Sequence, residues 1–426
     1  MRVLVVGSGG REHAIAWKLS QSPELEALYC APGNPGIAEL GELVPIAADR
    51  AAELAGFAEE QAIDLTVVGP ELPLTLGLVD ELRRRGLAAF GPTAAAAELE
   101  GSKVFAKEFM RRRGVPTADF RVVGERSEAE SAAAEFGLPV VLKADGLAAG
   151  KGVLIPESEE ELERSLEIFF EERRFGASGD RLLVEECLVG EEVSYIGISD
   201  GERFLPFACS KDYKRIGEQD LGPNTGGMGA HSPSGILSAD LERRVLAEVM
   251  QPTIAGMAAE GRRFSGFLYA GLMLTQEGPK VLEFNARLGD PEAQPLLLRL
   301  DEDLLTLLAA GAAGAFPDRG LSFHADAAAC IVLAAAGYPG TPAKGDAISG
   351  LAEAAARPGV EIFHAGTAVD GAELVTAGGR VLGVCARGRD LAAALATAYE
   401  ATDLIAWDGK ALRRDIGRRV VERIGA

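Results

Sequence analysis

The sequence predicts a mixed α/β and α+β protein, in which a doubly wound parallel sheet comes first and a small mixed β domain comes last. Its 426 residues are enough for roughly three domains. Residues 1–100 alternate short apolar runs with helical patterns, and glycine or proline follows most of these runs. This alternation is typical of a parallel sheet covered by helices. About the last hundred residues change in character, which indicates a separate domain.

Four strands are expected in the N-terminal part of the chain. They are Arg2–Val6, Leu28–Cys30, Leu65–Val68 and Leu87–Phe90. A helix is expected over His13–Leu19. Because open parallel sheets bind ligands at the carboxyl ends of their strands, the loops at those ends are expected to face a ligand.

The rest of the chain is expected to combine helices, strands and one long loop. Periodicity predicts two helices, Ser102–Arg113 and Glu159–Arg173. It predicts strands over Val140–Lys143, Leu182–Glu186, Leu268–Leu274 and Lys280–Phe284, of which the last two form a hairpin. The glycine-rich segment Cys209–Pro233 is expected to be a long loop that is either functional or disordered.

The C-terminal part is expected to contain a buried element, a hairpin and a basic helix. Ala327–Ala335 is expected to be a buried strand or helix. Gly378-Gly379 predicts a hairpin turn between Glu373–Ala377 and Arg380–Ala386. Lys410–Arg423 is expected to be a helix with a solvated basic face.

The composition argues against several classes of protein. The formal net charge is −21, and nucleic-acid binding needs clustered Lys and Arg, so no nucleic-acid footprint is expected. The five cysteines are far apart without a C-x-x-C motif, so buried reduced thiols are expected rather than disulfides or a zinc site. No signal peptide and no apolar run of about 18 residues occurs, so we expect a cytoplasmic protein without a membrane span.

The segment Gly7-Ser8-Gly9-Gly10-Arg11-Glu12 lies between a strand and a helix. Its glycines let backbone N–H groups approach an anion at a helix N-terminus. A dinucleotide fingerprint needs a third glycine where Glu12 stands, so an NAD site is not expected. A single bound phosphate group is the favoured interpretation, and a tight turn without a ligand is the alternative. Arg11 could pair with the anion or be an ordinary surface arginine.

A second glycine-rich segment, Lys143–Gly152, follows a predicted strand. It is not a P-loop, because Gly152 stands where Ser or Thr is required and position 145 is Asp. Lys143 and Lys151 supply positive charge, and the glycines let the backbone close over a ligand. A mobile flap over a triphosphate is therefore favoured, with a flexible surface loop as the alternative.

Polar and apolar side chains alternate in the sequence KVLEFNARLGDPE. On a strand, residues two apart face the same way, so Glu283, Asn285 and Arg287 are expected to project together while Leu282 and Phe284 pack behind. A carboxylate and an amide oxygen suit Mg²⁺ or Mn²⁺. Arg287 can hold a carboxylate or a phosphoryl oxygen in a planar fork. Taken alone, an edge strand with outward polar residues explains the pattern as well.

A fourth segment, Leu183–Glu192, combines the end of a strand with several glutamates. Its backbone could read an adenine edge and a carboxylate could hold ribose hydroxyls, whereas the alternative is an ordinary charged turn. No G-x-S-x-G, H-E-x-x-H or kinase motif set occurs, so no protein nucleophile is expected. Any chemistry would then rest on positioning and electrostatics.

Together these segments resemble the ATP-grasp superfamily and, within it, the phosphoribosylamine–glycine ligases (glycinamide ribonucleotide synthetases). The resemblance runs over essentially the whole chain, and its most specific motifs are GPNTGGMGA and the N-A-R-x-G-D-P-E run. One departure is SKDYKR, where the family has Gln-Asp-His-Lys-Arg, although Asp212, Lys214 and Arg215 keep their places. The resemblance implies a Rossmann-like domain over 1–101, a two-part ATP-grasp domain over 102–322 with a mobile ATP-binding subdomain at 117–190, and a C-terminal domain over 323–426.

The resemblance also implies a reaction and a role for each candidate residue. Glycine would be joined to 5-phosphoribosylamine through glycyl phosphate, as ATP becomes ADP and phosphate, in purine biosynthesis. ATP would contact Lys103, Lys143, Gly150, Lys151, Gly152, Glu185, Leu188 and Glu192. Phosphoribosylamine would contact Gly9, Gly10, Arg11, Glu12 and Asn34. Glycine would bind Asp212 and Arg287, Glu283 and Asn285 would hold Mg²⁺ or Mn²⁺, and the catalytic residues would be Arg287, Lys143 and Asp212.

Three other hypotheses stay open at this point. The first is an ATP-grasp ligase or carboxylase that acts on another carboxylate or on bicarbonate. The second is a nucleotide-binding sensor on the same fold that performs no reaction. The third is a dehydrogenase, which the Gly7–Glu12 segment disfavours. We expect a monomer or a weak dimer.

Overall fold

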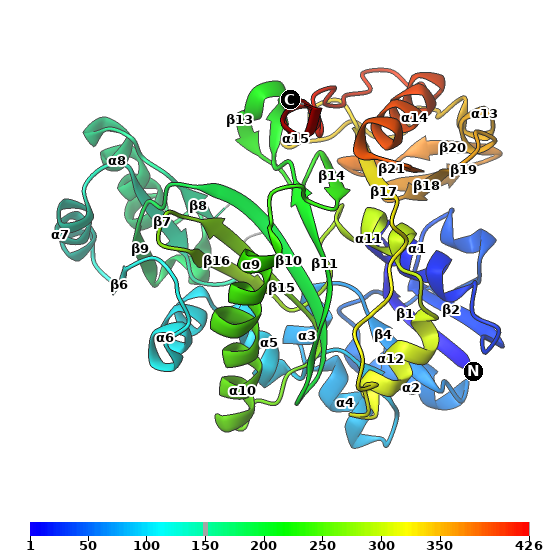
Figure 1. Cartoon of the computed structure of the whole chain (residues 1–426), viewed down its shortest axis with the longest axis horizontal. Helices are drawn as coiled ribbons and strands as arrows, with labels where there is room; N and C mark the ends of the chain where they lie inside the picture. The colour runs from blue at the N-terminus through cyan, green and yellow to red at the C-terminus, as the bar shows by residue number, and fades with distance from the viewer. Residues whose placement is uncertain (148–151, 426) are drawn as a thin grey trace.

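Three sheets and two small ribbons organise the part of the chain that the structure describes, residues 1–147 and 152–425. Figure 1 shows the computed structural model, with the N-terminal sheet at the lower right and a smaller sheet at the far left. The largest sheet runs between them and continues into the C-terminal part at the upper right.

The N-terminal sheet is parallel, with the strand order β3-β2-β1-β4-β5, as the sequence predicts. Its strands are β1 (Arg2–Gly7), β2 (Ala27–Pro32), β3 (Glu42–Leu43), β4 (Leu65–Val68) and β5 (Ala89–Phe90). The helices around it are α1 (Gly10–Leu19), α2 (Ala51–Glu60), α3 (Glu71–Thr75), α4 (Leu78–Arg84) and α5 (Ala94–Gly101), with a short 3-10 turn η1 (Ile37–Glu39). Alternate residues of β1 enter two different cores, so this strand is buried on both faces.

Helix α1 begins at Gly10, earlier than the predicted His13. The side chain of Glu12 folds back and accepts a hydrogen bond of 2.7 Å from the Gly9 N–H. This is one half of a capping box, which satisfies a backbone donor at the start of the helix. The helix therefore starts inside the glycine segment, and the segment is fixed against the carboxyl end of β1.

The small sheet at the left of Figure 1 has the order β6-β9-β7-β8. Its strands are β6 (Phe120–Val123), β7 (Val140–Ala144), β8 (Val153–Leu154) and β9 (Leu182–Glu186). The associated helical segments are α6 (Lys103–Arg113), α7 (Arg126–Phe136), α8 (Glu159–Leu166), η2 (Glu167–Glu171) and η3 (Gly176–Gly179). Ser102 caps α6 by accepting a 3.0 Å hydrogen bond from the Phe105 N–H, and Gly114 ends it with φ +68°. The predicted helix after Ser102 and the predicted strands are thus confirmed.

The large sheet is antiparallel, with the order β16-β15-β10-β11-β14-β17-β21-β18. These strands are β10 (Glu191–Asp200), β11 (Phe204–Asp212), β14 (Gly229–Ser232), β15 (Ser265–Leu274), β16 (Pro279–Asn285), β17 (Ala327–Ala334), β18 (Val360–His364) and β21 (Arg380–Gly388). The predicted β15–β16 hairpin is confirmed. Since β14 pairs with β17, residues that precede 323 and residues that follow it share one continuous sheet.

The remaining helices cover this sheet and the C-terminal end. They are α9 (Ala239–Arg244), η5 (Val245–Met250), α10 (Gln251–Ala259), α11 (Ala293–Arg299), α12 (Leu304–Ala312), α13 (Leu351–Ala355), α14 (Leu391–Leu404) and α15 (Arg418–Gly425). Within the residues that the structure describes, no helix has the length and apolar character needed to cross a membrane.

The expectation of a loop over Cys209–Pro233 is wrong. The segment contains the end of β11, a ribbon made of β12 (Arg215–Gly217) and β13 (Leu221–Asn224) joined by the turn η4 (Glu218–Asp220), and the whole of β14. Every residue of β14 is buried between β11 and β17. A Cβ at Gly229 would lie 2.8 Å from the Cys330 carbonyl oxygen. Some glycines of this segment therefore permit close strand packing, and they do not mark a free loop.

The predicted hairpin around Gly378-Gly379 is also wrong. Strand β20 (Glu373–Thr376) pairs with β19 (Thr367–Asp370), whereas β21 pairs with β17 and β18. A Cβ at Gly366 would lie 2.5 Å from the Gly378 Cα. The glycine pair thus marks a close approach of two backbones.

The basic C-terminal segment is helical only from Arg418 onward. Gly417, at φ +74°, precedes the helix, so the expected start at Lys410 is wrong. The side chain of Arg413 is 1% exposed, with ion pairs of 2.9 Å to Asp220 and 2.8 Å to Asp415. Part of the expected solvated basic face is therefore a buried ion-pair network.

Candidate active site

The site is built around the end of β16, where Glu283 lies opposite Gly271 and Asn285 lies opposite Tyr269 on β15. A register shift at Leu272 interrupts the alternation of the strand before Glu283. For this reason Val281 is buried and Leu282 is only half-buried, whereas Phe284 packs in the core as expected. The Asn285 Oδ1 atom accepts a 3.3 Å hydrogen bond from Arg287, and the Arg287 charge also acts on Glu283, so the three predicted polar residues do lie near one another.

Three lysines surround the Glu283 carboxylate. Burial alone would raise the pKa of Glu283, but the charges of Lys214, Lys143 and Lys103 outweigh it and hold the pKa below its usual value. Burial lowers the pKa of Lys103, and the Glu283 charge opposes that shift. The charges of three lysines therefore act on one half-buried carboxylate, and their ammonium groups are cations that a polyanionic ligand could contact.

Lys143 reaches this region from the small sheet. Its ammonium lies 3.0 Å from Glu185 Oε1 and donates a 3.0 Å hydrogen bond to the Leu282 carbonyl. Leu188 is half-buried in the connection between β9 and β10, and the Gly152 carbonyl accepts a hydrogen bond from the Ala144 N–H. The candidates Gly150 and Lys151 lie outside the described residues.

Lys214 and Glu192 form an ion pair across the site. Burial would lower the pKa of Lys214, but Glu192, followed by Tyr269 and Glu283, raises it well above its usual value. Lys214 stands in the SKDYKR segment and was not among the candidate site residues. Lys214 is therefore a further cation near Glu283. Its unchanged place in the family motif is the signal that could have identified it.

Asp212 ends β11 beside the same group of charges. Its Oδ1 atom is buried and has no hydrogen-bond partner among the described residues. Burial, together with the nearby Glu292 carboxylate, raises the pKa of Asp212 well above its usual value. A Cβ at Gly227, where φ is +114°, would lie 2.7 Å from this oxygen, so the glycine-rich segment closes directly over it.

Arg287 is held by two carboxylates. Its Nε lies 3.0 Å from Glu71 Oε2, and its Nη2 lies 3.2 Å from Glu100 Oε1. The other oxygen of Glu100 accepts a 2.7 Å hydrogen bond from the Ala286 N–H. Burial would lower the pKa of Arg287, but the charges of Glu100 and Glu71 raise it, so the guanidinium is charged and fixed in direction.

The N-terminal glycine segment meets the same region through Asp290. A Cβ at Gly9 would lie 2.9 Å from Glu12 Oε2 and 3.4 Å from Asp290 Oδ2. Arg11 pairs with Glu12 and donates a 3.0 Å hydrogen bond to the Leu288 carbonyl. The segment after β1 and the segment after β16 are therefore in contact.

Arg380 joins this contact from the C-terminal part of the chain. Its Nη2 lies 3.1 Å from Asp290 Oδ2. Burial would raise the pKa of Asp290, but Arg380 lowers it. No local motif marks Arg380, because the pairing of β21 with β17 is what brings it to Asp290.

Asn34 lies close to the glycine segment but uses its side chain within the protein. Its Nδ2 donates hydrogen bonds of 2.9 Å to the carbonyls of Ser8 and His364. Its Oδ1 accepts a 3.0 Å hydrogen bond from the Ile37 N–H. Asn34 would reach a substrate only if one of these bonds were exchanged.

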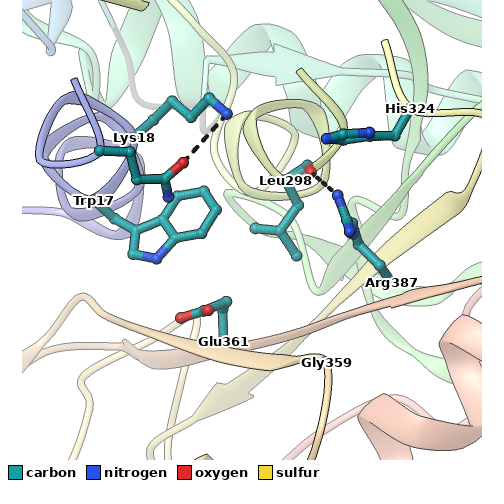
Figure 2. Close-up of a pocket in the computed structure, with 8 residues that line it drawn as sticks. Trp17, Lys18, Leu298, His324, Gly359, Glu361 and Arg387 are labelled. Atoms are coloured by element: carbon teal, nitrogen blue, oxygen red, sulfur yellow. Dashed lines mark hydrogen bonds between the residues drawn. The ribbon is translucent and has the colours of Figure 1, made fainter. Parts of the chain in front are cut away.

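A separate cavity of about 260 Å³ lies where α1, α11 and the β18–β21 pair meet (Figure 2). Lys18 donates to the Leu300 carbonyl at 2.7 Å, and Arg387 donates to the Leu298 carbonyl at 3.2 Å. Burial raises the pKa of Glu361 on the facing wall. The cavity is lined by Trp17, Lys18, Gln21, Leu298, His324, Gly359, Glu361 and Arg387, so it is separate from the cluster around Glu283.

The small sheet and the large antiparallel sheet, which meet at a strand end with several lysines, form the fold of the ATP-grasp class of enzymes. Three family models match the chain: the phosphoribosylglycinamide synthetase N domain at residues 1–100, its ATP-grasp (A) domain at 101–293 and its C domain at 328–419. The chain belongs to the phosphoribosylglycinamide synthetase family, which confirms the resemblance seen in its motifs. Enzymes of the ATP-grasp class use ATP with a divalent metal ion.

Relatives of known name match over nearly the full length. Phosphoribosylamine–glycine ligases of Allochromatium vinosum and Pseudomonas aeruginosa are 50% and 49% identical, and each alignment covers 99% of both chains. A crystal structure of the Thermotoga maritima phosphoribosylamine–glycine ligase aligns with TM-score 0.85 and 35% identity, over 97% of this chain and 100% of that one. The biotin carboxylase domain of the Hydrogenobacter thermophilus 2-oxoglutarate carboxylase, at TM-score 0.73 and 18% identity over 96% of this chain and 91% of that one, shares the fold.

Proposed function

We propose that the chain joins glycine to 5-phospho-D-ribosylamine, giving glycinamide ribonucleotide, ADP and phosphate by way of glycyl phosphate, in de novo purine biosynthesis. Full-length relatives with this name support the proposal. The observation that carries it is the cluster of Lys103, Lys143 and Lys214 around Glu283. It supplies the positive charge that a transferring phosphoryl group requires.

In this proposal the nucleotide lies between the small sheet and the large one. Lys103 and Lys143 contact the phosphates, and Gly150, Lys151 and Gly152 are further ATP-binding residues. The backbone at Glu185 and Leu188 binds adenine, and Glu192 binds the ribose. Lys214 pairs with Glu192 and would fix the direction of that carboxylate.

The amino acid would lie between Arg287 and Asp212. A glycine carboxylate oxygen attacks the γ-phosphorus, and the bond to the β-phosphate oxygen breaks to release ADP. Arg287 orients that carboxylate and offsets developing charge. The phosphoribosylamine nitrogen then attacks the acyl carbon, phosphate leaves, and the nitrogen loses a proton. Asp212, whose buried Oδ1 has no hydrogen-bond partner among the described residues, is the group that would accept this proton.

Glu283 and Asn285 are the residues that would hold the metal ion, and we propose Mg²⁺ or Mn²⁺. The donor set fits: one carboxylate with a lowered pKa and one amide oxygen leave most of the coordination shell to water and phosphate. Within the described residues, no cluster of three or more His, Cys, Asp and Glu side chains could hold an ion. A divalent ion at this place neutralises phosphate charge when it is bound.

The second substrate would bind where the N-terminal segment meets Asp290. We propose that Gly9, Gly10, Arg11, Glu12 and Asn34 shape the phosphoribosylamine site, with Asn34 acting through the loop that it holds. We propose that the boundaries between the N-terminal, ATP-grasp and C-terminal domains lie at 101/102 and 322/323. The subdomain that moves would be 117–190. We also propose a cytoplasmic protein that is a monomer or a weak dimer, and sedimentation of the purified chain would test its oligomeric state.

A coupled assay for ADP with each component omitted in turn tests the proposed function. Turnover is expected only when ATP, a divalent ion, glycine and phosphoribosylamine are all present. ADP release that is indifferent to glycine would contradict the proposal and favour a ligase or carboxylase for another acid. Binding of ATP with no turnover under any condition would favour a sensor.

A further inference from the structure

Lys107 is a buried lysine of α6 that none of the proposed substrate contacts uses. It is 2% exposed. Its ammonium lies 2.7 Å from Glu185 Oε2 and donates to Thr117 Oγ1 at 2.8 Å and to the Ala118 carbonyl at 3.3 Å. An ammonium has three N–H donors, so all of them are satisfied within the protein. Lys107 is therefore a fixed internal charge.

The partner of Lys107 is shared with the proposed phosphate-binding lysine. Glu185 is 1% exposed, and its other oxygen lies 3.0 Å from the Lys143 ammonium. Lys143 has one further bond, to the Leu282 carbonyl next to Glu283. One buried carboxylate thus joins two buried lysines that differ in their other partners, since Lys143 bonds to the Leu282 carbonyl beside Glu283, whereas Lys107 bonds to Thr117 and Ala118.

This arrangement has a consequence for nucleotide binding. If Lys143 turns toward a phosphate group, it weakens its contact with Glu185. A buried carboxylate without a counter-ion is costly, because the charge has lost its hydration and gained no partner. Lys107 removes most of that cost, because it stays in contact with Glu185 whatever Lys143 does.

We propose that Lys107 is a positioning residue for ATP: it is the permanent counter-ion of Glu185, and it leaves Lys143 free to bind the nucleotide phosphates. The inference rests on the proposed ATP contact of Lys143. Lys107 itself does not touch the nucleotide in this account. Its replacement should weaken ATP binding only as long as Glu185 carries a charge.

The charge of Lys107 is sensitive to pH in a useful range. Burial lowers the pKa of Lys107 to about 8, against the opposing charge of Glu185. The charged groups that face it are Glu185 and Glu186 of β9 and Lys143 of β7. Above about pH 8 the counter-ion is lost, so ATP affinity should fall there as long as Glu185 is present.

Titration calorimetry with MgATP on the full chain tests this inference without requiring turnover. Lys107→Met should raise the Kd about tenfold, whereas in a Glu185→Gln background the same change should have little effect. Arg111→Met is the matched control: Arg111 is exposed on the same helix and lies over the same Phe120 ring as Lys107, and its loss should leave the Kd unchanged.

The outcomes separate this inference from the proposed function. An unchanged Kd in Lys107→Met, or an equal loss in both backgrounds, overturns the role of Lys107 while the proposed function stands. Failure of the wild-type chain to bind MgATP overturns both. If Lys107→Met does not fold, the same titration repeated at several pH values decides. The Kd should rise above about pH 8 in the wild type and should not rise in Glu185→Gln. A rise that persists in Glu185→Gln overturns the inference.

Discussion

Replacing Arg287 should separate its contribution to stability from its contribution to catalysis. Its side chain is 19% exposed, and those of its partners Glu100 and Glu71 are 7% and 30% exposed. Removing one member of a buried pair costs about 3–5 kcal/mol, whereas a half-exposed pair contributes at most about 1 kcal/mol. Arg287→Met should therefore lower the free energy of unfolding by about 3–4 kcal/mol, mainly through Glu100.

A second substitution should restore much of this stability. Burial raises the pKa of Glu100 even with Arg287 beside it, so the unpaired carboxylate is the main source of the loss. In the double variant Arg287→Met/Glu100→Gln that charge is absent, and stability should recover by about 2 kcal/mol. Turnover should stay at least a hundredfold lower in both variants, about 3 kcal/mol of transition-state stabilisation.

Denaturant unfolding followed by fluorescence, together with the ADP assay, measures the two effects on the same preparations. Arg287→Lys is the control, since it keeps the charge but loses the planar fork. Equal stability of Arg287→Met and the wild type would refute the assignment of a buried pair. Recovery of turnover along with stability in the double variant would refute the catalytic role of Arg287.

Three further predictions concern the metal, acid stability and the glycine segment. Glu283→Gln should reduce turnover about a hundredfold or more and weaken the response to Mg²⁺ and Mn²⁺, and a metal titration with unchanged half-saturation would contradict the site. Burial lowers the pKa of His13 to about 3 and that of His364 to about 4, so their contribution to stability is present above about pH 6.5 and is lost as pH falls toward 4. In His364→Gln, the free energy of unfolding should therefore fall less steeply between pH 7 and pH 4 than in the wild type. An unchanged slope would contradict this expectation. Gly227→Ala should raise the KM for glycine about tenfold, because its Cβ would lie 2.4 Å from Pro291 and 2.7 Å from Asp212. Gly261→Ala is the control: its φ is also positive, but its Cβ would have no atom within 4 Å, so the KM should not change. Equal KM values in the two variants would contradict the closure over Asp212.

The parts of the site that follow from local sequence are those where one strand or one loop carries the signal. Glu283 and Asn285 are two residues apart on β16, so alternation accounts for their proximity, and Arg287 follows the strand and donates a hydrogen bond to Asn285. Even there, the register shift that leaves Leu282 only half-buried could not be foreseen, because it depends on the pairing with β15. Local patterns thus give the residue types of the site more reliably than its packing.

The parts that could not be predicted come from pairings between distant segments. Lys107 has the sequence pattern of an ordinary helix lysine, and its role follows from the burial of α6 against Glu185. Arg380 reaches Asp290 only because β21 joins the large sheet. The glycines at 378 and 379 match a turn signal, but a second backbone at Gly366 explains them better.

The central claim is that glycine is activated by phosphoryl transfer at this site, and the fate of its carboxylate oxygens tests it most directly. The full chain would be supplied with ATP, a divalent ion, phosphoribosylamine and glycine labelled with ¹⁸O in both carboxylate oxygens. If glycyl phosphate forms and is then attacked by the amine, each released phosphate carries one ¹⁸O atom. Phosphate whose added oxygen comes from solvent water, with unlabelled product phosphate from labelled glycine, would contradict the account.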